Sequence, residues 1–160
     1  MNDLSLSTGG VDFIEAREGK RLKVYKDSAG RDTIGVGHLC TSHDPVEFWK
    51  ENGITEAQCY GLLIQDTSHA VHAVNTLATV QLNQNQFDAL VSFTFNLGSG
   101  ALAHSTLLKY LNAGNFHDAA SQFLVWDKQH VNGALVFSQG LLMRRQLEKT
   151  LFLTPLPPIV

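Results

Sequence analysis

The feature that most constrains the fold is a change of hydrophobic period at residues 21–41. Apolar and polar residues alternate over 22–25 and again over 33–36, which predicts two short strands. The segment between them begins with Asp27 and carries Gly30 at its fourth position, as a type I turn prefers. We therefore expect a β-hairpin, followed by a candidate third strand. A sheet this small cannot bury its own face, so helices must cover it.

Helical patterns occupy most of the remaining chain. A short pattern over 11–18 ends at Gly19, where a helix C-cap glycine belongs. Thr55 and Gln58 form a capping box before a helix that runs to about Leu77. Further helices are expected at 45–52, 87–97, 101–112, 116–126 and 139–151. The segment 87–97 is apolar nearly all round, which marks a buried central helix.

These elements predict an α+β fold with two lobes. We expect a small β-hairpin lobe (about 11–60) and a larger all-helical lobe (about 61–153), joined by a long helix, within one domain over 1–160. Residues 154–160 are expected to be a tail, because the prolines there exclude a helix. Residues 1–8 are expected to be a loose lead-in. A cleft between two lobes is a natural place for a polymer to bind.

Composition narrows the class of protein. Hydrophobic residues make up 44% of the chain and the net charge is -3, so the chain is globular and a nucleic-acid partner is disfavoured. The polar start is not a signal peptide, and no apolar run reaches the length of a membrane span. Cys40 and Cys59 are too few for a disulfide scaffold. One bridge between them stays open, but two small buried thiols are favoured.

Three polar side chains around the hairpin suggest a catalytic site. Glu18 is expected in the last helical turn, where the helix dipole disfavours the ionised carboxyl, so it suits a proton donor. Asp27, in an open polar turn, suits a carboxylate that stays ionised. Thr33 resumes the strand after the turn, and its hydroxyl could hold a water beside Asp27. Glycoside hydrolysis needs such a pair of carboxyl groups.

Spacing alone does not make these residues catalytic, because acidic residues at helix ends and in turns are commonly just solvated. Glu15 and Asp32 are rival carboxylates. Glu15 lies one turn back on the helix and is expected to pair with Arg17, Lys20 or another cation.

The run from Glu18 to His38 resembles the bacteriophage lysozyme (endolysin) family, glycoside hydrolase family 24. The family pattern is E-G, then L-x-x-Y-x-D, then G-x-x-T-I-G-x-G-H, and this chain carries it at those intervals. Weaker matches follow around Ile54, over 86–98 and over 140–145, so that the resemblance covers roughly 10–152.

The resemblance implies a muramidase that hydrolyses the β-1,4 bond between N-acetylmuramic acid and N-acetylglucosamine. Its substrate would be the glycan strands of peptidoglycan, and its role host cell lysis. Glu18 matches the general acid, Asp27 the carboxylate that activates or orients water, and Thr33 its water-positioning partner. The family is inverting and uses no metal or organic cofactor. We expect a monomer that stays in the host cytoplasm until release through a holin pore, does not insert stably in a membrane, and acts on the wall in the periplasm.

Three residues near the acids have roles that the sequence leaves open. Leu39 and Phe95 match family positions that line the sugar site, although core packing is the alternative for each. His38 is expected to be structural. Asp66 falls on an otherwise apolar row of the long helix and needs a donor, so we predict a His38–Asp66 ion pair.

Asp66, His69 and His72 do not form a convincing metal site. Their spacing turns the outer two side chains apart on a helix, and no further ligand completes a set. We therefore expect His69 and His72 to be surface residues.

Two other functions remain open. A lytic transglycosylase would need only Glu18 as its essential acid and would yield 1,6-anhydromuramic ends. A non-catalytic wall-binding or structural protein of a phage particle would keep the fold without the chemistry, and the joint presence of Glu18, Asp27 and Thr33 argues against it.

Overall fold

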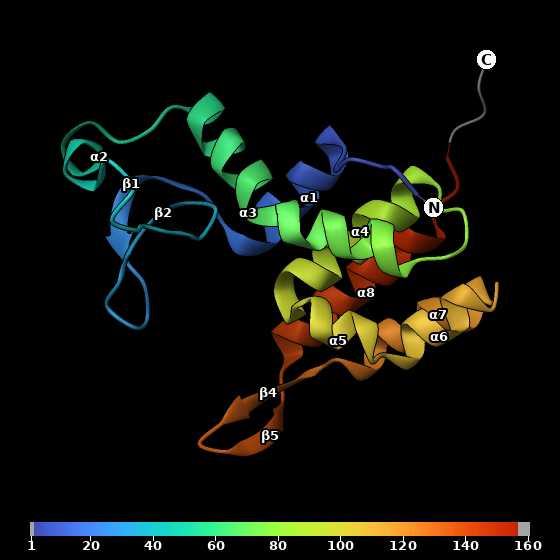
Figure 1. The fold of residues 1–160 in the computed structure, drawn as a ribbon. Helices are drawn as coiled ribbons and strands as arrows, with labels where there is room; N and C mark the ends of the chain where they lie inside the picture. The colour runs from blue at the N-terminus through green and yellow to red at the C-terminus, as the bar shows by residue number, and fades with distance from the viewer. Residues whose placement is uncertain (1, 157–160) are drawn as a thin grey trace. The chain divides into compact units, whose positions relative to one another are not determined.

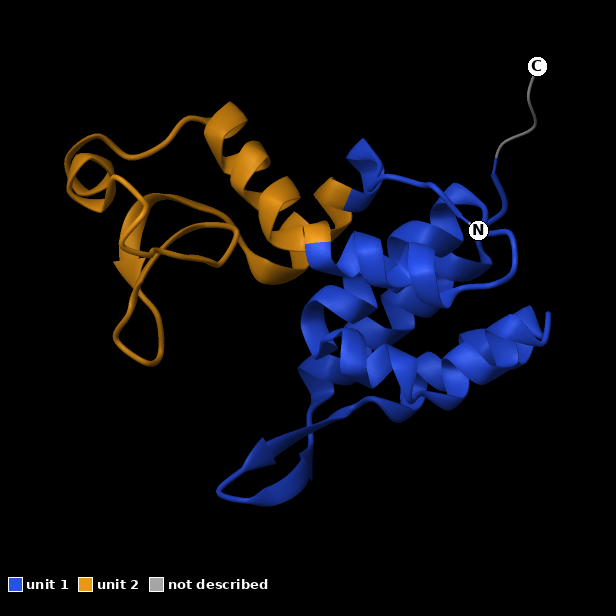
Figure 2. Cartoon of the chain, in the orientation of Figure 1, with its two compact units in different colours: residues 1–10, 69–160 blue, residues 11–68 orange. Residues whose placement is uncertain are grey.

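The computed structural model describes residues 2–156 and divides into two compact units (Figure 2). The small unit comprises residues 11–68, and the large unit comprises residues 69–156 with the N-terminal segment up to Gly10. The mixed α+β class expected from the sequence is confirmed. Within residues 2–156, no helix combines the length and apolarity that a membrane crossing needs.

The small unit contains the predicted hairpin and the helices around it (Figure 1). Its core residues come from every one of these elements except β1 and β3, and include Ile14, Ile34, Trp49 and Leu63. The elements are α1 (Thr8–Glu18), β1 (Arg21–Lys26), β2 (Asp32–Gly35), β3 (His38–Leu39), α2 (Val46–Asn52) and the first half of α3 (Glu56–Leu77).

The three strands form an antiparallel sheet in the order β1-β2-β3. Thr33, on the central strand β2, faces Tyr25 of β1 and Leu39 of β3. The register of β1 against β2 shifts between Arg21 and Tyr25, as at a β-bulge. The third strand predicted from the sequence is therefore present, and the middle strand carries a candidate site residue.

The large unit is built around α4, whose residues from Phe87 to Thr94 are all buried. Helix α8 packs against α4, and Phe93, Phe123 and Phe152 form an aromatic cluster, with ring centroids 5.4 Å apart for the first pair and 5.6 Å for the second. Its elements are the second half of α3, α4 (Gln84–Leu97), α5 (Ser99–Ala103), α6 (Thr106–Asn112), α7 (Phe116–Gln122), η1 (Phe123–Val125), β4 (Lys128–Val131), β5 (Ala134–Phe137) and α8 (Gln139–Leu153).

The description of the larger lobe as all-helical was wrong in one place, because β4 and β5 form a second antiparallel hairpin. Its turn is Asn132-Gly133, and both residues have positive φ, at 50° and 82°. Asn-Gly with two positive φ angles is the pattern of a type I′ hairpin turn. The dipeptide was therefore a signal for a hairpin as well as for a turn.

The helix predicted over 101–112 is interrupted at Ser105. The Ser105 hydroxyl donates to the Leu102 carbonyl and accepts from the Leu108 N–H, so it ends α5 and caps α6. Serine competes for backbone groups in this way, which favours a cap over a helix interior. The segment 116–126 likewise divides into α7 and the 3₁₀ turn η1.

The N-terminal segment is not the loose lead-in that was expected. Asn2 donates to two carbonyls, those of Ala78 and Val80, and the backbone of Leu4 exchanges two hydrogen bonds with the Asn75 amide. These bonds hold residues 2–4 against the end of α3. At the other end, residues 157–160 of the predicted tail lie outside the described residues, and the division into lobes at about residue 60 stays a prediction.

Candidate functional site

Glu18 is the last residue of α1, as predicted. Gly19 follows with a φ of 79°, and its N–H donates to the Glu15 carbonyl at 2.9 Å. A left-handed glycine in this position ends a helix, so the sequence E-G fixes where the Glu18 side chain leaves the helix. That side chain is exposed.

An ion triad fastens this helix end within the small unit. Lys20 Nζ lies 2.8 Å from a Glu15 oxygen and 2.7 Å from a Glu56 oxygen at the start of α3. The hydrogen bond to Glu15 raises the pKa of Lys20 most, and the one to Glu56 raises it further. The predicted pairing of Glu15 with a nearby cation is confirmed, and Glu15 is thereby engaged by Lys20.

Asp27 is held in its turn by backbone and side chain together. Gly30 N–H donates to the Asp27 carbonyl at 2.9 Å, which closes the predicted turn. The Asp27 carboxylate accepts from the Ala29 and Arg31 N–H groups through Oδ1, and from the Arg31 guanidinium through Oδ2. The Arg31 N–H and then its side chain lower the pKa of Asp27, so this carboxyl is ionised at neutral pH.

Thr33 is almost fully buried in the central strand and is bound by the same residue, Arg31, that binds Asp27. Its hydroxyl donates to the Arg31 carbonyl at 3.2 Å, while the Arg31 N–H donates to Asp27 Oδ1 at 2.9 Å. With its one proton engaged, the Thr33 oxygen keeps acceptor capacity for a further donor. The structure therefore links these two predicted site residues, Asp27 at the start of the turn and Thr33 on β2, through the backbone of Arg31.

Leu39 lies directly across the sheet from Thr33. Directly paired residues of neighbouring strands project on the same face, and the Leu39 side chain is 40% exposed there. An exposed leucine beside a buried threonine is available to contact a ligand. Phe95 belongs to the large unit, where it is half-buried on α4 with its ring centroid 6.3 Å from that of His69.

His38 contacts Asp66, the partner that the sequence predicts for it. His38 Nδ1 lies 2.9 Å from Asp66 Oδ2, and Nε2 lies 3.4 Å from Asp44 Oδ2. The imidazole is buried and packs edge-on to Trp49. Asp44 in turn accepts from the N–H and hydroxyl of Thr41. His38 thus ties β3 to α3 and to the loop before α2, which supports the structural role expected for it.

The rival carboxylate Asp32 is engaged elsewhere. It lies 2.8 Å from Lys26 Nζ and 3.2 Å from Lys50 Nζ. The hydrogen bond from Lys26 and, after it, the one from Lys50 lower the pKa of Asp32, although burial opposes them. These two lysines leave Asp32 as part of a surface ion cluster.

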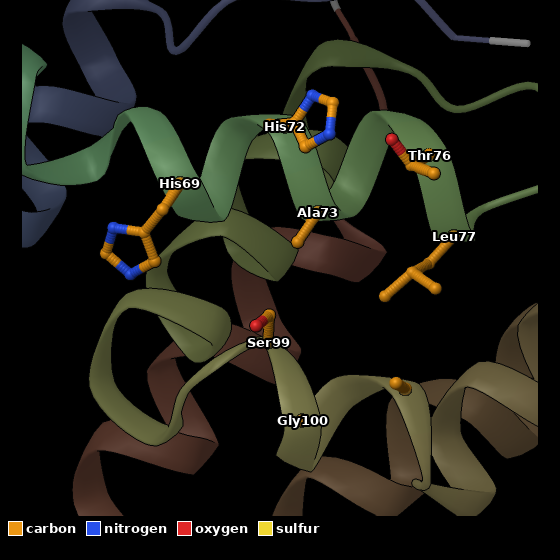
Figure 3. Close-up of a pocket in the computed structure, with 8 residues that line it drawn as sticks. His69, His72, Ala73, Thr76, Leu77, Ser99 and Gly100 are labelled. Carbon is orange, nitrogen blue, oxygen red and sulfur yellow. The ribbon is translucent and has the colours of Figure 1, made fainter.

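The large unit carries a pocket of about 450 Å³ between α3 and α5 (Figure 3). His69 and His72 lie on its rim, and their rings point to different sides of α3 (Figure 3). Both are exposed, which confirms them as surface residues. Across residues 2–156, no three His, Cys, Asp or Glu side chains gather as metal ligands would.

Cys40 and Cys59 are both free thiols. Cys59 is buried and Cys40 is half-buried, and burial is the main reason that the pKa of each is raised. The favoured interpretation of two small buried thiols is confirmed for Cys59 and only in part for Cys40, which is half-buried.

Arg31 is the residue near the site that the sequence analysis missed. Its position four residues after Asp27, on the other side of a tight turn, was a signal that the two could pair. Taken together, the small unit presents an exposed carboxyl at a helix end, an ionised carboxylate in a rigid turn, and a hydroxyl fixed beside it. These groups suit acid–base hydrolysis.

Comparison with known proteins agrees with this arrangement. The model of the phage lysozyme family matches residues 15–148. The endolysin of Bacillus phage B103 is 44% identical over 153 residues, which are 94% of this chain and 55% of that protein, so the chain spans about half of its length. The structure of the endolysin from Escherichia coli O157:H7 phage FAHEc1 is 39% identical, with a TM-score of 0.87 over 99% of both chains. The muramidase domain of SpmX from Asticaccaulis excentricus is 36% identical, with a TM-score of 0.80 over 96% of this chain and 100% of that one.

Proposed function

The chain belongs to the phage lysozyme family, glycoside hydrolase family 24, and from that premise we propose that it is an endolysin that hydrolyses peptidoglycan. The bond cut is the β-1,4 linkage between N-acetylmuramic acid and N-acetylglucosamine. The observation that supports the proposal is that Asp27 and Thr33 both bond to the backbone of Arg31, the first to its N–H and the second to its carbonyl, downstream of Glu18 at the end of α1.

Glu18 acts as the general acid. Its carboxyl group donates a proton to the glycosidic oxygen as the C–O bond breaks, so the leaving sugar departs as a neutral alcohol. Glu18 is the last residue of α1, so its side chain leaves the helix at the point where Gly19 ends it. An exposed position leaves that proton accessible to a bound glycan.

Asp27 and Thr33 act on the water. Asp27 takes a proton from the attacking water, and the Thr33 hydroxyl oxygen accepts its other proton in a hydrogen bond and so orients it. The water attacks the face of the sugar opposite the leaving group, which inverts the anomeric carbon. No metal or organic cofactor takes part in this scheme. Leu39 of the small unit is a candidate contact for the glycan strand, and so is Phe95 within the large unit.

The enzyme works on the wall of the host, and its glycan strands are its partner. We place its synthesis in the host cytoplasm, with action in the periplasm after release. It acts as a monomer and does not rely on stable membrane insertion or on nucleic acid.

Mass spectrometry of the fragments released from purified walls tests this function. The parent enzyme should release reducing muramic ends, whereas Glu18→Gln and Asp27→Asn should each lose most activity, about a hundredfold or more, since each removes one acid–base group. Glu15→Gln and Asp32→Asn are matched controls, because they neutralise the two rival carboxylates, and both should retain activity.

The same experiment separates the other functions. Anhydromuramic ends, with Asp27→Asn still active, would identify a transglycosylase. Binding to walls without any released fragment would identify a non-catalytic wall protein. For a hydrolase, proton NMR of the first product should show the α-anomer, and a β-anomer would contradict inversion.

A further inference from the structure

Both oxygens of the Asp27 carboxylate are engaged by donors from its own turn. Oδ1 accepts from Ala29 N–H at 2.8 Å and from Arg31 N–H at 2.9 Å. Oδ2 lies 2.9 Å from Arg31 Nε and 2.8 Å from Arg31 Nη2. Three hydrogen bonds and the ion-pair contact of Arg31 Nη2 therefore surround a carboxylate that offers about four lone-pair sites.

This arrangement conflicts with the role of Asp27 as a water activator. A carboxylate that takes a proton from water must first accept a hydrogen bond from that water. The two donors on Oδ1 are backbone groups fixed by the turn. The two on Oδ2 belong to one flexible side chain, which is 59% exposed. The Arg31 guanidinium is therefore the donor that can leave with the least disturbance of the fold.

We propose that Arg31 is a positioning residue for Asp27, which occupies Oδ2 in the resting enzyme and yields it to the attacking water when a glycan binds. This inference rests on the proposed function. The chemistry is an exchange of hydrogen bonds: the guanidinium leaves Oδ2 and is solvated, and a water proton takes its place. No covalent step is added to the hydrolysis.

The charge of the Arg31 guanidinium, like its position on Oδ2, makes Asp27 less able to take a proton from water. The guanidinium lowers the pKa of Asp27, although less than the Arg31 N–H does. A substitution of Arg31 removes the guanidinium but keeps the backbone. The N–H groups of Ala29 and of residue 31 therefore still donate to Oδ1. Asp27 then keeps its orientation and stays ionised at neutral pH, but it becomes a stronger base with a free oxygen.

The test compares Arg31→Gln with Lys26→Gln, which removes an equal charge from the same hairpin. Lys26 pairs with Asp32 and not with Asp27, and Asp32 keeps Lys50 in that variant. For Arg31→Gln at neutral pH and low salt, we expect kcat on soluble peptidoglycan fragments to rise about twofold to fivefold, because an exposed ion pair no longer has to open. KM should change little. The acid limb of the kcat profile should move to higher pH, and Lys26→Gln should show neither effect.

A second variant, Arg31→Lys, keeps the test valid if Arg31→Gln does not fold. A titration of Asp27 adds a measurement that does not depend on activity. Arg31→Lys keeps the charge but not the two-point contact, so its kcat should fall between those of the parent and Arg31→Gln. Carbon-13 NMR titration of the Asp27 carboxyl should show a higher pKa in Arg31→Gln than in the parent, with Lys26→Gln unchanged.

Three results would overturn the inference: a lower kcat in Arg31→Gln, a raised KM with unchanged kcat, or an Asp27 titration that does not move. The second would make Arg31 a glycan contact. None of them bears on the proposed function, which is tested separately by the wall fragments that the parent, Asp27→Asn and Glu18→Gln release.

Discussion

At the scale of single residues, His38 shows how one buried polar group can organise the site region. Its imidazole joins the strand that carries Leu39 to Asp66 on α3 and to Asp44 in the loop before α2. A polar ring buried to this extent is stable only with its partners present. Loss of either carboxylate should therefore weaken the packing of β3. This strand pairs with β2, the strand that carries Thr33, and β2 lies between it and β1.

We expect Asp66→Asn to lower the free energy of unfolding by about 1–2 kcal/mol. Hydrogen bonds to charged groups contribute about 1.5–3 kcal/mol, and the partial exposure of Asp66 reduces that value. Urea denaturation followed by circular dichroism measures the change. Asp12→Asn, on the exposed side of α1, is the control and should stay within about 0.5 kcal/mol of the parent. Equal stabilities of the two variants would show that the His38–Asp66 contact does not stabilise the fold.

The pairing of His38 with Asp66 could be predicted from the sequence, whereas the position of Arg31 only made a contact with Asp27 possible. Asp66 interrupts an apolar row, and a carboxylate in such a row requires a donor. Arg31 lies in a polar turn, where nothing requires a partner. Its contact depends on the turn backbone and on the side-chain rotamer, neither of which a pattern of residue types specifies.

At the scale of elements, α4 and α8 are joined by a buried polar cluster. Glu148 Oε1 accepts from the Ser92 hydroxyl at 2.8 Å and from Arg144 Nε at 3.1 Å, and Oε2 lies 3.2 Å from Arg145 Nε. All of these side chains are buried. Burial raises the pKa of Glu148, whereas the two arginines lower it. The cluster therefore balances a strong desolvation cost against close pairing.

Replacing Glu148 with Gln should destabilise the protein by about 3–5 kcal/mol, because two buried guanidinium groups lose this carboxylate. Thermal and urea unfolding measure the loss. Ser92→Ala removes only the neutral donor to the same oxygen, so about 1 kcal/mol is expected. If Glu148→Gln is no more destabilising than Ser92→Ala, the ion cluster contributes specificity of packing but little stability.

The elements that could be predicted are those with both a cap and a periodic face. The helices α3 and α4 begin at capping boxes, Thr55 with Gln58 and Asn83 with Gln86, and both boxes are present in the structure. The β4–β5 hairpin has no such face, since all of its residues are exposed. Without one buried side there is no clear alternation to distinguish a strand from a helix, and only its Asn-Gly turn remains as a signal.

At the scale of the whole molecule, the shifted carboxyl groups are divided unevenly between the two units. Asp27, Asp32 and Asp44 all have lowered pKa values, and all belong to the small unit. For Asp44, burial is the largest influence and raises the pKa, but hydrogen bonds from Thr41 and His38 outweigh it. Glu148, in the large unit, is shifted in the opposite direction.

This division predicts that acid opens the small unit first. A carboxyl whose folded pKa is lowered stabilises the fold above its unfolded pKa, about pH 4 for Asp, and that contribution is lost as pH falls through the folded value. A carboxyl with a raised folded pKa makes no contribution of this kind, so Glu148 gives the large unit no such loss of stability as the pH falls.

Amide hydrogen exchange between about pH 6 and pH 3 measures this difference, after correction for the intrinsic exchange rate. Protection of the β1–β3 sheet should fall at higher pH than protection of α4 and α8. Asp44→Asn should make the protection of the sheet depend less on pH, because the side-chain amide that replaces the carboxyl does not titrate. The pH dependence of protection in α4 should stay as in the parent. Loss of protection at the same pH in both units would contradict this prediction. It would mean that the two units unfold together, whatever the pKa values of their carboxyl groups.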